Sequence, residues 1–180
     1  MTIAIIVLIV IVIAITIWVI STSNRFKVLL VKITEADSGI DVALTKRYDT
    51  LTKLIDVVKA YAGHETELFE KIVRLRSGMS MTEKIEANHL MDEASKRINV
   101  LAENYPELRS SENYKQLQVA IVEVEDHLQA ARRVYNMNVS SFNQSIAVFP
   151  ASIIAIKAHY TPKDFFEAEE IKRADVKITL

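Results

Sequence analysis

The chain of 180 residues contains no cysteine, which excludes disulfides, thiolate metal ligands and cysteine nucleophiles. It has only three glycines, Gly39, Gly63 and Gly78, and they lie far apart, so they cannot form a glycine-rich loop that binds phosphate. The formal net charge of -1 gives no basic surface of the kind that binds nucleic acid. We therefore expect no nucleic-acid partner and no cofactor.

The N-terminal segment lacks charged side chains until Arg25, and Thr16 is the only polar residue from Ile3 to Ile20. As a helix, this run would cover roughly the 30 Å of a bilayer's hydrocarbon, whereas a core strand is far shorter. A secretory signal has a basic start and a shorter apolar run, and neither is present. Trp18 is placed as an aromatic residue at a membrane interface would be. The sequence therefore predicts a transmembrane helix over residues 1–24 and a lipid bilayer as partner.

Basic residues follow this segment and none precedes it: Arg25, Lys27 and Lys32 lie shortly after its end. Because such residues are enriched on the cytoplasmic side of a span, we expect a single-pass protein of the cell membrane. Its short N-terminus would lie outside and its C-terminal body in the cytoplasm.

The rest of the chain lacks the alternation that is typical of strands, and its apolar residues recur at steps of three and four. This spacing predicts helices over about 25–77, 82–104 and 110–149, within a bundle covering 25–160. Ser80 and Glu83 match a capping box, while Pro106 and Pro150 mark helix ends. The predicted fold class is all-α: the transmembrane helix continues into an elongated antiparallel three-helix bundle. The mixed charges of 161–180 predict a partly mobile tail.

The first predicted helix is much longer than the second, so the two cannot cover each other fully. Either it breaks at Gly39 or Gly63, or its uncovered apolar stripe packs on another copy of the chain. The second alternative predicts a homo-oligomer. Asn138, a polar residue on the predicted seam of the third helix, is a candidate for fixing register or oligomeric state.

A short apolar segment, residues 151–156, follows Pro150 and is too short to span a membrane. We expect it to pack as a cap on the bundle. An interfacial membrane contact and an oligomer surface are the alternatives, and its isoleucines are Ile153, Ile154 and Ile156.

Glu86 and His89 form the sharpest metal candidate, an E-x-x-H pair on a helix. Di-iron bundles need two such pairs and further glutamates on four helices. Glu123 and His127 lie four apart and do not supply the second pair, so a surface histidine beside a glutamate is favoured. His64 and Glu65 lack a nucleophile at a defined spacing and are favoured as hydrogen-bonding surface residues.

Two basic clusters have a functional and a structural interpretation. Lys46, Arg47 and Asp49 straddle the apolar stripe of the first helix, and Arg132 and Arg133 are expected to face outward beside the third. They could bind acidic lipid or a protein partner. Interhelical ion pairs, worth under about 1 kcal/mol each when exposed, are the favoured interpretation.

Three blocks of the sequence resemble the bacterial LemA family. They are residues 46–65, which contain Lys-Arg-Tyr-Asp; residues 103–118, which contain Glu-Asn-Tyr-Pro-Glu-Leu; and residues 131–167, which contain Ala-Arg-Arg and end in Phe-Phe-Glu. The chain departs from the family at Thr52, where proline is common, and in its short link at 77–81. The resemblance implies an external N-terminus, one span and a helical cytoplasmic body, and it implies no established reaction.

These observations favour a membrane-anchored helical scaffold or interaction protein that self-associates and is not an enzyme, with an unknown protein partner. The alternative from another class is a metal-dependent, di-iron-like helical-bundle enzyme, which rests on Glu86 and His89 alone.

Overall fold

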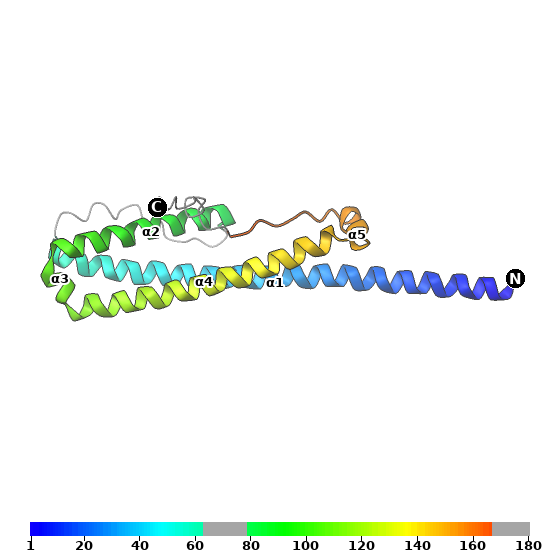
Figure 1. Cartoon of the computed structure of the whole chain (residues 1–180), viewed down its shortest axis with the longest axis horizontal. Helices are drawn as coiled ribbons and strands as arrows, with labels where there is room; N and C mark the ends of the chain where they lie inside the picture. The colour runs from blue at the N-terminus through cyan, green and yellow to red at the C-terminus, as the bar shows by residue number, and fades with distance from the viewer. Residues whose placement is uncertain (63–78, 167–180) are drawn as a thin grey trace, which may run out of the picture. The chain divides into compact units, whose positions relative to one another are not determined.

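A computed structural model describes residues 1–62 and 79–166 (Figure 1). Within these residues every regular element is a helix: α1 (Thr2–Ala62), α2 (Met81–Asn104), α3 (Pro106–Ser110), α4 (Glu112–Ala147) and α5 (Ala151–Lys157). The chain is therefore all-α, with an N-terminal apolar helix, as the sequence predicts. The predicted helical stretch 63–77, His64, Glu65 and the tail beyond Phe166 lie outside the described residues.

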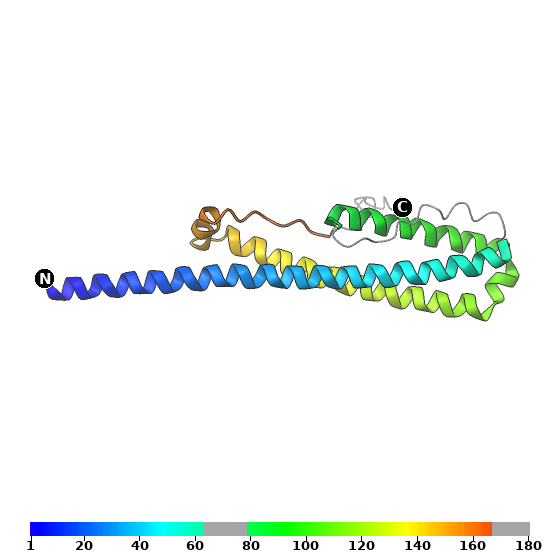
Figure 2. The same cartoon turned by 180° about the vertical axis from the view of Figure 1, so that it is seen from behind.

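Helix α1 runs without interruption for 61 residues, because no proline occurs before Pro106. It passes through Gly39 with no break, and open space surrounds the position of a Cβ there. Figure 2 shows α1 as one continuous ribbon from the N-terminus. The alternative of a break at Gly39 is therefore excluded, and Gly63 lies outside the described residues.

Ends of the other helices follow local chemistry. The Ser80 hydroxyl accepts a hydrogen bond from the Glu83 backbone N–H at 3.3 Å, and the Ser80 N–H donates to the Glu83 carboxylate at 2.7 Å. This confirms the predicted capping box. Tyr105 ends α2 before Pro106, and α4 ends at Ala147, so Phe149 lies beyond the helix and not on its seam.

The described chain forms two compact units, and α1 and α4 contribute to both. Of the described residues, the first unit comprises Met1–Gly39 and Arg133–Asp164, and the second comprises 40–62, 79–132 and 165–166. In the second unit, buried apolar side chains of α1, α2 and α4 form the core, including Leu44, Leu51, Leu54, Met91, Ile98, Val124 and Leu128.

The direction of α2 differs from the prediction of an antiparallel bundle. Asp41 pairs with Lys84 and Arg47 pairs with Asp92, so position increases along both helices together and α1 and α2 run parallel. Helix α4 runs antiparallel to both. Residues 63–80 connect α1 to α2, and a chain of that length can reach roughly 60 Å, which is longer than α2. Two consecutive helices can run parallel only if the connection between them is long enough to return along the length of the second helix.

In the first unit, the part of α4 from Arg133 onward and the segment 158–164 cover α1 after its apolar end. The Tyr160 ring makes edge contacts with Phe26 and Phe142, at centroid distances of 5.4 and 6.0 Å. Asn143 exchanges two hydrogen bonds with the backbone of Lys163, at 2.8 and 2.9 Å. Segment 158–164 therefore packs against α1 and α4 in the first unit without forming a helix.

The seam of α4 differs by one residue from the predicted seam. Val139 is fully buried between Tyr135 and Phe142, whereas Asn138 is half-buried. Its amide donates a hydrogen bond to the carbonyl of Lys32 at 3.2 Å. Helical spacing allows either Asn138, three residues after Tyr135, or Val139, four residues after it, on the buried face. The apolar residue, Val139, occupies the core. A role for Asn138 in fixing register or oligomeric state stays a prediction.

Candidate functional site

The second unit contains a charged cluster in its core, centred on Arg47 of α1. The Arg47 side chain is 6% exposed and takes the position between Leu44 and Leu51 in the apolar seam. Its guanidinium pairs with Asp92 of α2, and with Glu125 of α4 at 2.9 Å. It also donates to the side-chain oxygen of Asn88. Arg47 thus links all three long helices of this unit.

The predicted ion pairs are present at Arg47, but the assumption that they are exposed is wrong. Buried charges cost free energy unless they are paired and hydrogen-bonded, and here the guanidinium meets two carboxylates and an amide. A second pair joins Lys84, which is 3% exposed, to Asp41 at 2.7 Å. The position of Arg47 within steps of three and four is the signal that could have placed it in the core.

Arg132 also belongs to this cluster, and the prediction that it faces outward is wrong. It is half-buried, and the carbon at the centre of its guanidinium lies 4.6 Å from the centroid of the Phe166 ring. Its Nε and Nη2 atoms are buried without a hydrogen-bond partner. The two N–H groups on that edge match the spacing of a carboxylate or phosphate. Sequence spacing gave no sign that Arg132 turns inward, because Phe166 is distant from it in the chain. Arg133 is exposed, as expected.

Burial lowers the pKa of Arg132 below its usual value, while the nearby Glu125 carboxylate acts to raise it. Arg47 lowers the pKa further and Asp92 raises it. Two cations, Arg47 and Arg132, and two carboxylates, Asp92 and Glu125, therefore lie close enough to interact electrostatically. The cluster can orient the three helices relative to one another, and it contains no nucleophile.

The predicted metal candidate is not assembled into a site. Glu86 is exposed and His89 is half-buried on α2. Across residues 1–62 and 79–166, no group of three or more histidines, aspartates and glutamates is placed to hold a metal ion. Glu123 and His127 are exposed and border a shallow hollow on α4 with Asp126 and Ala130.

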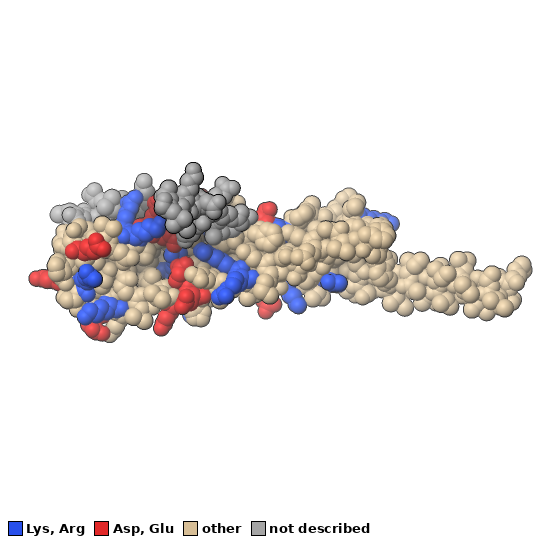
Figure 3. Space-filling model, viewed as in Figure 1, with Lys and Arg blue, Asp and Glu red and all other residues tan. Residues whose placement is uncertain are grey.

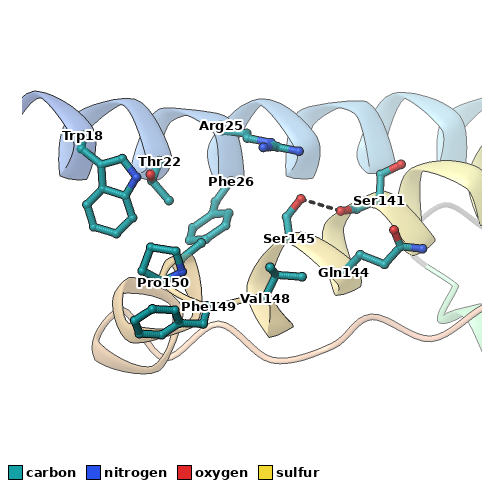
Figure 4. A pocket seen from close by; sticks show the side chains of 11 residues that line it. Trp18, Thr22, Arg25, Phe26, Ser141, Gln144, Ser145, Val148, Phe149 and Pro150 are labelled. Atoms are coloured by element: carbon teal, nitrogen blue, oxygen red, sulfur yellow. Dashed lines mark hydrogen bonds between the residues drawn. The ribbon is translucent and has the colours of Figure 1, made fainter.

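A pocket of about 440 Å³ lies in the first unit, beside the end of the apolar part of α1. Trp18, Thr22, Arg25 and Phe26 line it from α1, as Figure 4 shows. The end of α4 and the turn to α5 line the other side, with Ser141, Gln144, Ser145, Val148, Phe149, Pro150 and Ala151. The pocket therefore combines aromatic walls with one cation, three hydroxyl groups and one side-chain amide.

The remaining predicted site residues lie on α1 and α5. Helix α1 is the one helix in the described parts of the chain that is by itself long and apolar enough to cross a membrane. Ile3, Trp18 and Ile20 are exposed on it, and Figure 3 shows its N-terminal part without charged side chains. On α5, Ile153 and Ile156 are exposed and Ile154 is half-buried.

Fold and site define a class: an all-helical protein with an apolar N-terminal helix and a charged core cluster, for which the described residues show no catalytic constellation. The chain belongs to the LemA family, whose model matches residues 36–180. It is 33% identical over 150 residues to Protein LemA of Metamycoplasma hominis, covering 81% of this chain and 68% of that protein. This confirms the resemblance seen in the sequence.

More distant matches cover a smaller part of the chain. Magnetosome protein MamQ 2 of Paramagnetospirillum magneticum is 28% identical over 71 residues, which is 39% of this chain and 26% of that protein. Magnetosome protein MamQ of Magnetospirillum gryphiswaldense is 24% identical over 70 residues, with the same coverage. The matched segment thus spans about a quarter of the length of these relatives.

Proposed function

We propose that this LemA-family chain is a membrane-anchored helical interaction protein that self-associates at the cell membrane. The observation that carries the proposal is the continuity of α1, which leads from an exposed apolar segment directly into the core of a helical bundle. A helix satisfies its own backbone hydrogen bonds, as any segment in lipid must. The N-terminus would lie outside and the body in the cytoplasm, since Arg25, Lys27 and Lys32 follow the span.

Self-association has a different support from the one expected from sequence. Segment 158–164 and α4 cover much of α1 after Phe26, so a long uncovered stripe is not the reason. Instead, Val28 and Val31 form an exposed pair of aliphatic side chains one turn apart, soon after the apolar segment. Two exposed valines by themselves are ordinary on a protein surface, so the support lies in their position beside the apolar segment. A second copy, held in the same membrane by its own α1, can pack on this pair.

The mass of the particle in mild detergent tests this proposal. Light scattering of the full chain is expected to give a protein mass that is a multiple of 20.4 kDa. Replacing Val28 and Val31 by serine is expected to lower the mass toward one chain. Val119→Ser with Val122→Ser is the matched control, because these exposed valines are also three apart, on α4. A monomeric mass at every concentration would overturn self-association.

A further inference from the structure

Helix α5 is held in a defined position and yet exposes apolar side chains. Ala155 is buried, and the Tyr160 N–H donates to the Ala155 carbonyl at 3.0 Å, while the Tyr160 ring packs against Phe26 and Phe142. On the outer side, Ile153 is 58% exposed, Ile156 75% and Phe149 77%. We call these three residues the α5 apolar face, in which Phe149 stands two residues before the helix. The contacts of Ala155 and Tyr160 hold the helix itself in place.

The depth of this region relative to the span can be estimated along α1. The apolar run ends at Ile20, and Thr22 and Arg25 follow it by roughly 3 and 8 Å along a helix. The polar layer on each side of a bilayer's hydrocarbon is about 5–8 Å thick. Because Thr22 and Arg25 line one pocket with Phe149, the turn into α5 lies at the level of lipid headgroups if α1 spans the membrane.

The charge of this region points to the same surface. No aspartate or glutamate occurs in residues 1–34 or in residues 133–163, although the chain contains 23 of them. Basic residues do occur there: Arg25, Lys27 and Lys32 on α1, with Arg133, Lys157 and Lys163 in the second stretch. Glu35, Asp37 and Asp164 are the acidic residues of this unit. Juxtamembrane basic residues are attracted to anionic lipid, and acidic ones are repelled.

The pocket beside α1 offers a binding position for a polar group at the depth of the lipid headgroups. Trp18 and Phe149 give it aromatic walls, and the exposed Arg25 supplies a cation, as Figure 4 shows. The hydroxyl of Ser145 donates to the carbonyl of Ser141 at 2.7 Å. One cation beside hydroxyl oxygens and aromatic edges is the chemistry that suits a phosphate at the boundary of lipid and water.

We propose that α5 is a second membrane contact, whose apolar face rests in the headgroup layer of anionic lipid beside the α1 span, with a lipid phosphate seated next to Arg25. The inference rests on the proposed membrane anchoring and adds a lipid class and a surface to it. Helix α5 is too short to cross the bilayer, so it lies along the interface as an amphipathic element does. Lys157 reaches lipid phosphates from the end of the helix.

Spin labels on single cysteines test the proposal, and the absence of native cysteine makes each label unique. The full chain is reconstituted in vesicles of phosphatidylcholine with phosphatidylglycerol. Labels are placed at Ile153→Cys on the α5 apolar face, at Ile9→Cys in the span, and at Val122→Cys on α4. Val122 is the matched control, because it is aliphatic and 61% exposed. Accessibility to oxygen, which concentrates in lipid, is compared with accessibility to a water-soluble nickel complex.

The oxygen-to-nickel ratio at residue 153 is expected to exceed that at residue 122 several-fold and to approach that at residue 9. If residue 153 matches residue 122 while residue 9 is in lipid, the α5 contact is overturned and the anchor stands. If residue 9 is also in water, the anchor itself fails. Low accessibility of residue 153 to both reagents would mean a protein interface and would also overturn the contact.

Lipid charge supplies the second arm of the test. The ratio at residue 153 is expected to fall in vesicles of phosphatidylcholine alone. Combining Arg25→Gln with Lys157→Gln is expected to remove most of this difference between the two vesicles, while Lys96→Gln with Lys115→Gln, on α2 and α4, leaves it unchanged. If the oxygen-to-nickel ratio at residue 153 is the same in both kinds of vesicle and in all these variants, the role of anionic lipid is overturned.

Discussion

Arg47 shows how a single side chain can determine the arrangement of three helices. It occupies a seam position that apolar residues fill on either side, and it pairs with carboxylates from α2 and α4. A buried ion pair adds little net stability compared with a well-packed apolar core, but removing one partner leaves the others uncompensated. Arg47 therefore specifies which turns of the helices face one another.

Replacing Arg47 by methionine is expected to lower the free energy of unfolding by about 1–3 kcal/mol. The expected loss of stability is smaller than for a fully buried ion pair, because the Asp92 and Glu125 side chains are 35% and 32% exposed and can be hydrated again. Thermal and denaturant unfolding of the full chain in detergent, followed by circular dichroism, measures the change. Lys46→Met is the control, since Lys46 is exposed on the same helix.

Adding Asp92→Leu and Glu125→Leu to Arg47→Met is expected to restore part of the lost stability, since no carboxylate is then left without its cation. Unchanged unfolding in the single Arg47→Met variant would contradict the role assigned to this residue.

At the scale of elements, helix ends follow rules that act over a few residues. Ser80 and Glu83 satisfy each other's backbone N–H groups at the start of α2, and prolines stand just after α2 and after α4. Helix α5 differs, because its position depends on Tyr160 and on the bonds between Asn143 and Lys163. Local chemistry therefore starts and ends the helices, and distant contacts place them.

Replacing Ser80 by alanine is expected to destabilise the chain by about 1 kcal/mol, because the first turn of α2 loses an acceptor for the Glu83 N–H. Hydrogen exchange should rise at the N-terminal end of α2 and not in α4. Thr82→Ala is the control, since Thr82 is exposed in the first turn of the same helix. Equal effects of the two substitutions would contradict the capping role.

At the scale of the whole molecule, α1 combines two parts with different surroundings. Its first part exposes apolar side chains all round, and its second part buries one face in a bundle. A helix that is apolar on every side requires an apolar environment. Under the proposed membrane anchoring, one helix links the protein's location to its folding.

Membrane retention of the full chain is expected to withstand alkaline extraction. Replacing Ile9 and Ile13 by lysine should release it, since each charge at the centre of a span costs roughly 2.5–3.5 kcal/mol. Immunoblotting of the pellet and supernatant measures the distribution. Val122→Lys is the control, because Val122 is also an exposed apolar residue but lies on α4. This variant should stay in the pellet. Release of the unmodified chain would contradict anchoring.

The sequence by itself determined the helical class, the apolar length of the first helix, the capping box and the family, because each depends on residues close in the chain or on short motifs. Periodicity identified the buried face of α4 to within one residue, but could not choose Val139 over Asn138, since both fit steps of three and four. Only the tertiary structure decided that α1 and α2 run parallel and that Arg47 and Arg132 turn inward. Those features depend on contacts between residues far apart in the chain, and spacing within one helix contains no information about what its neighbour presents.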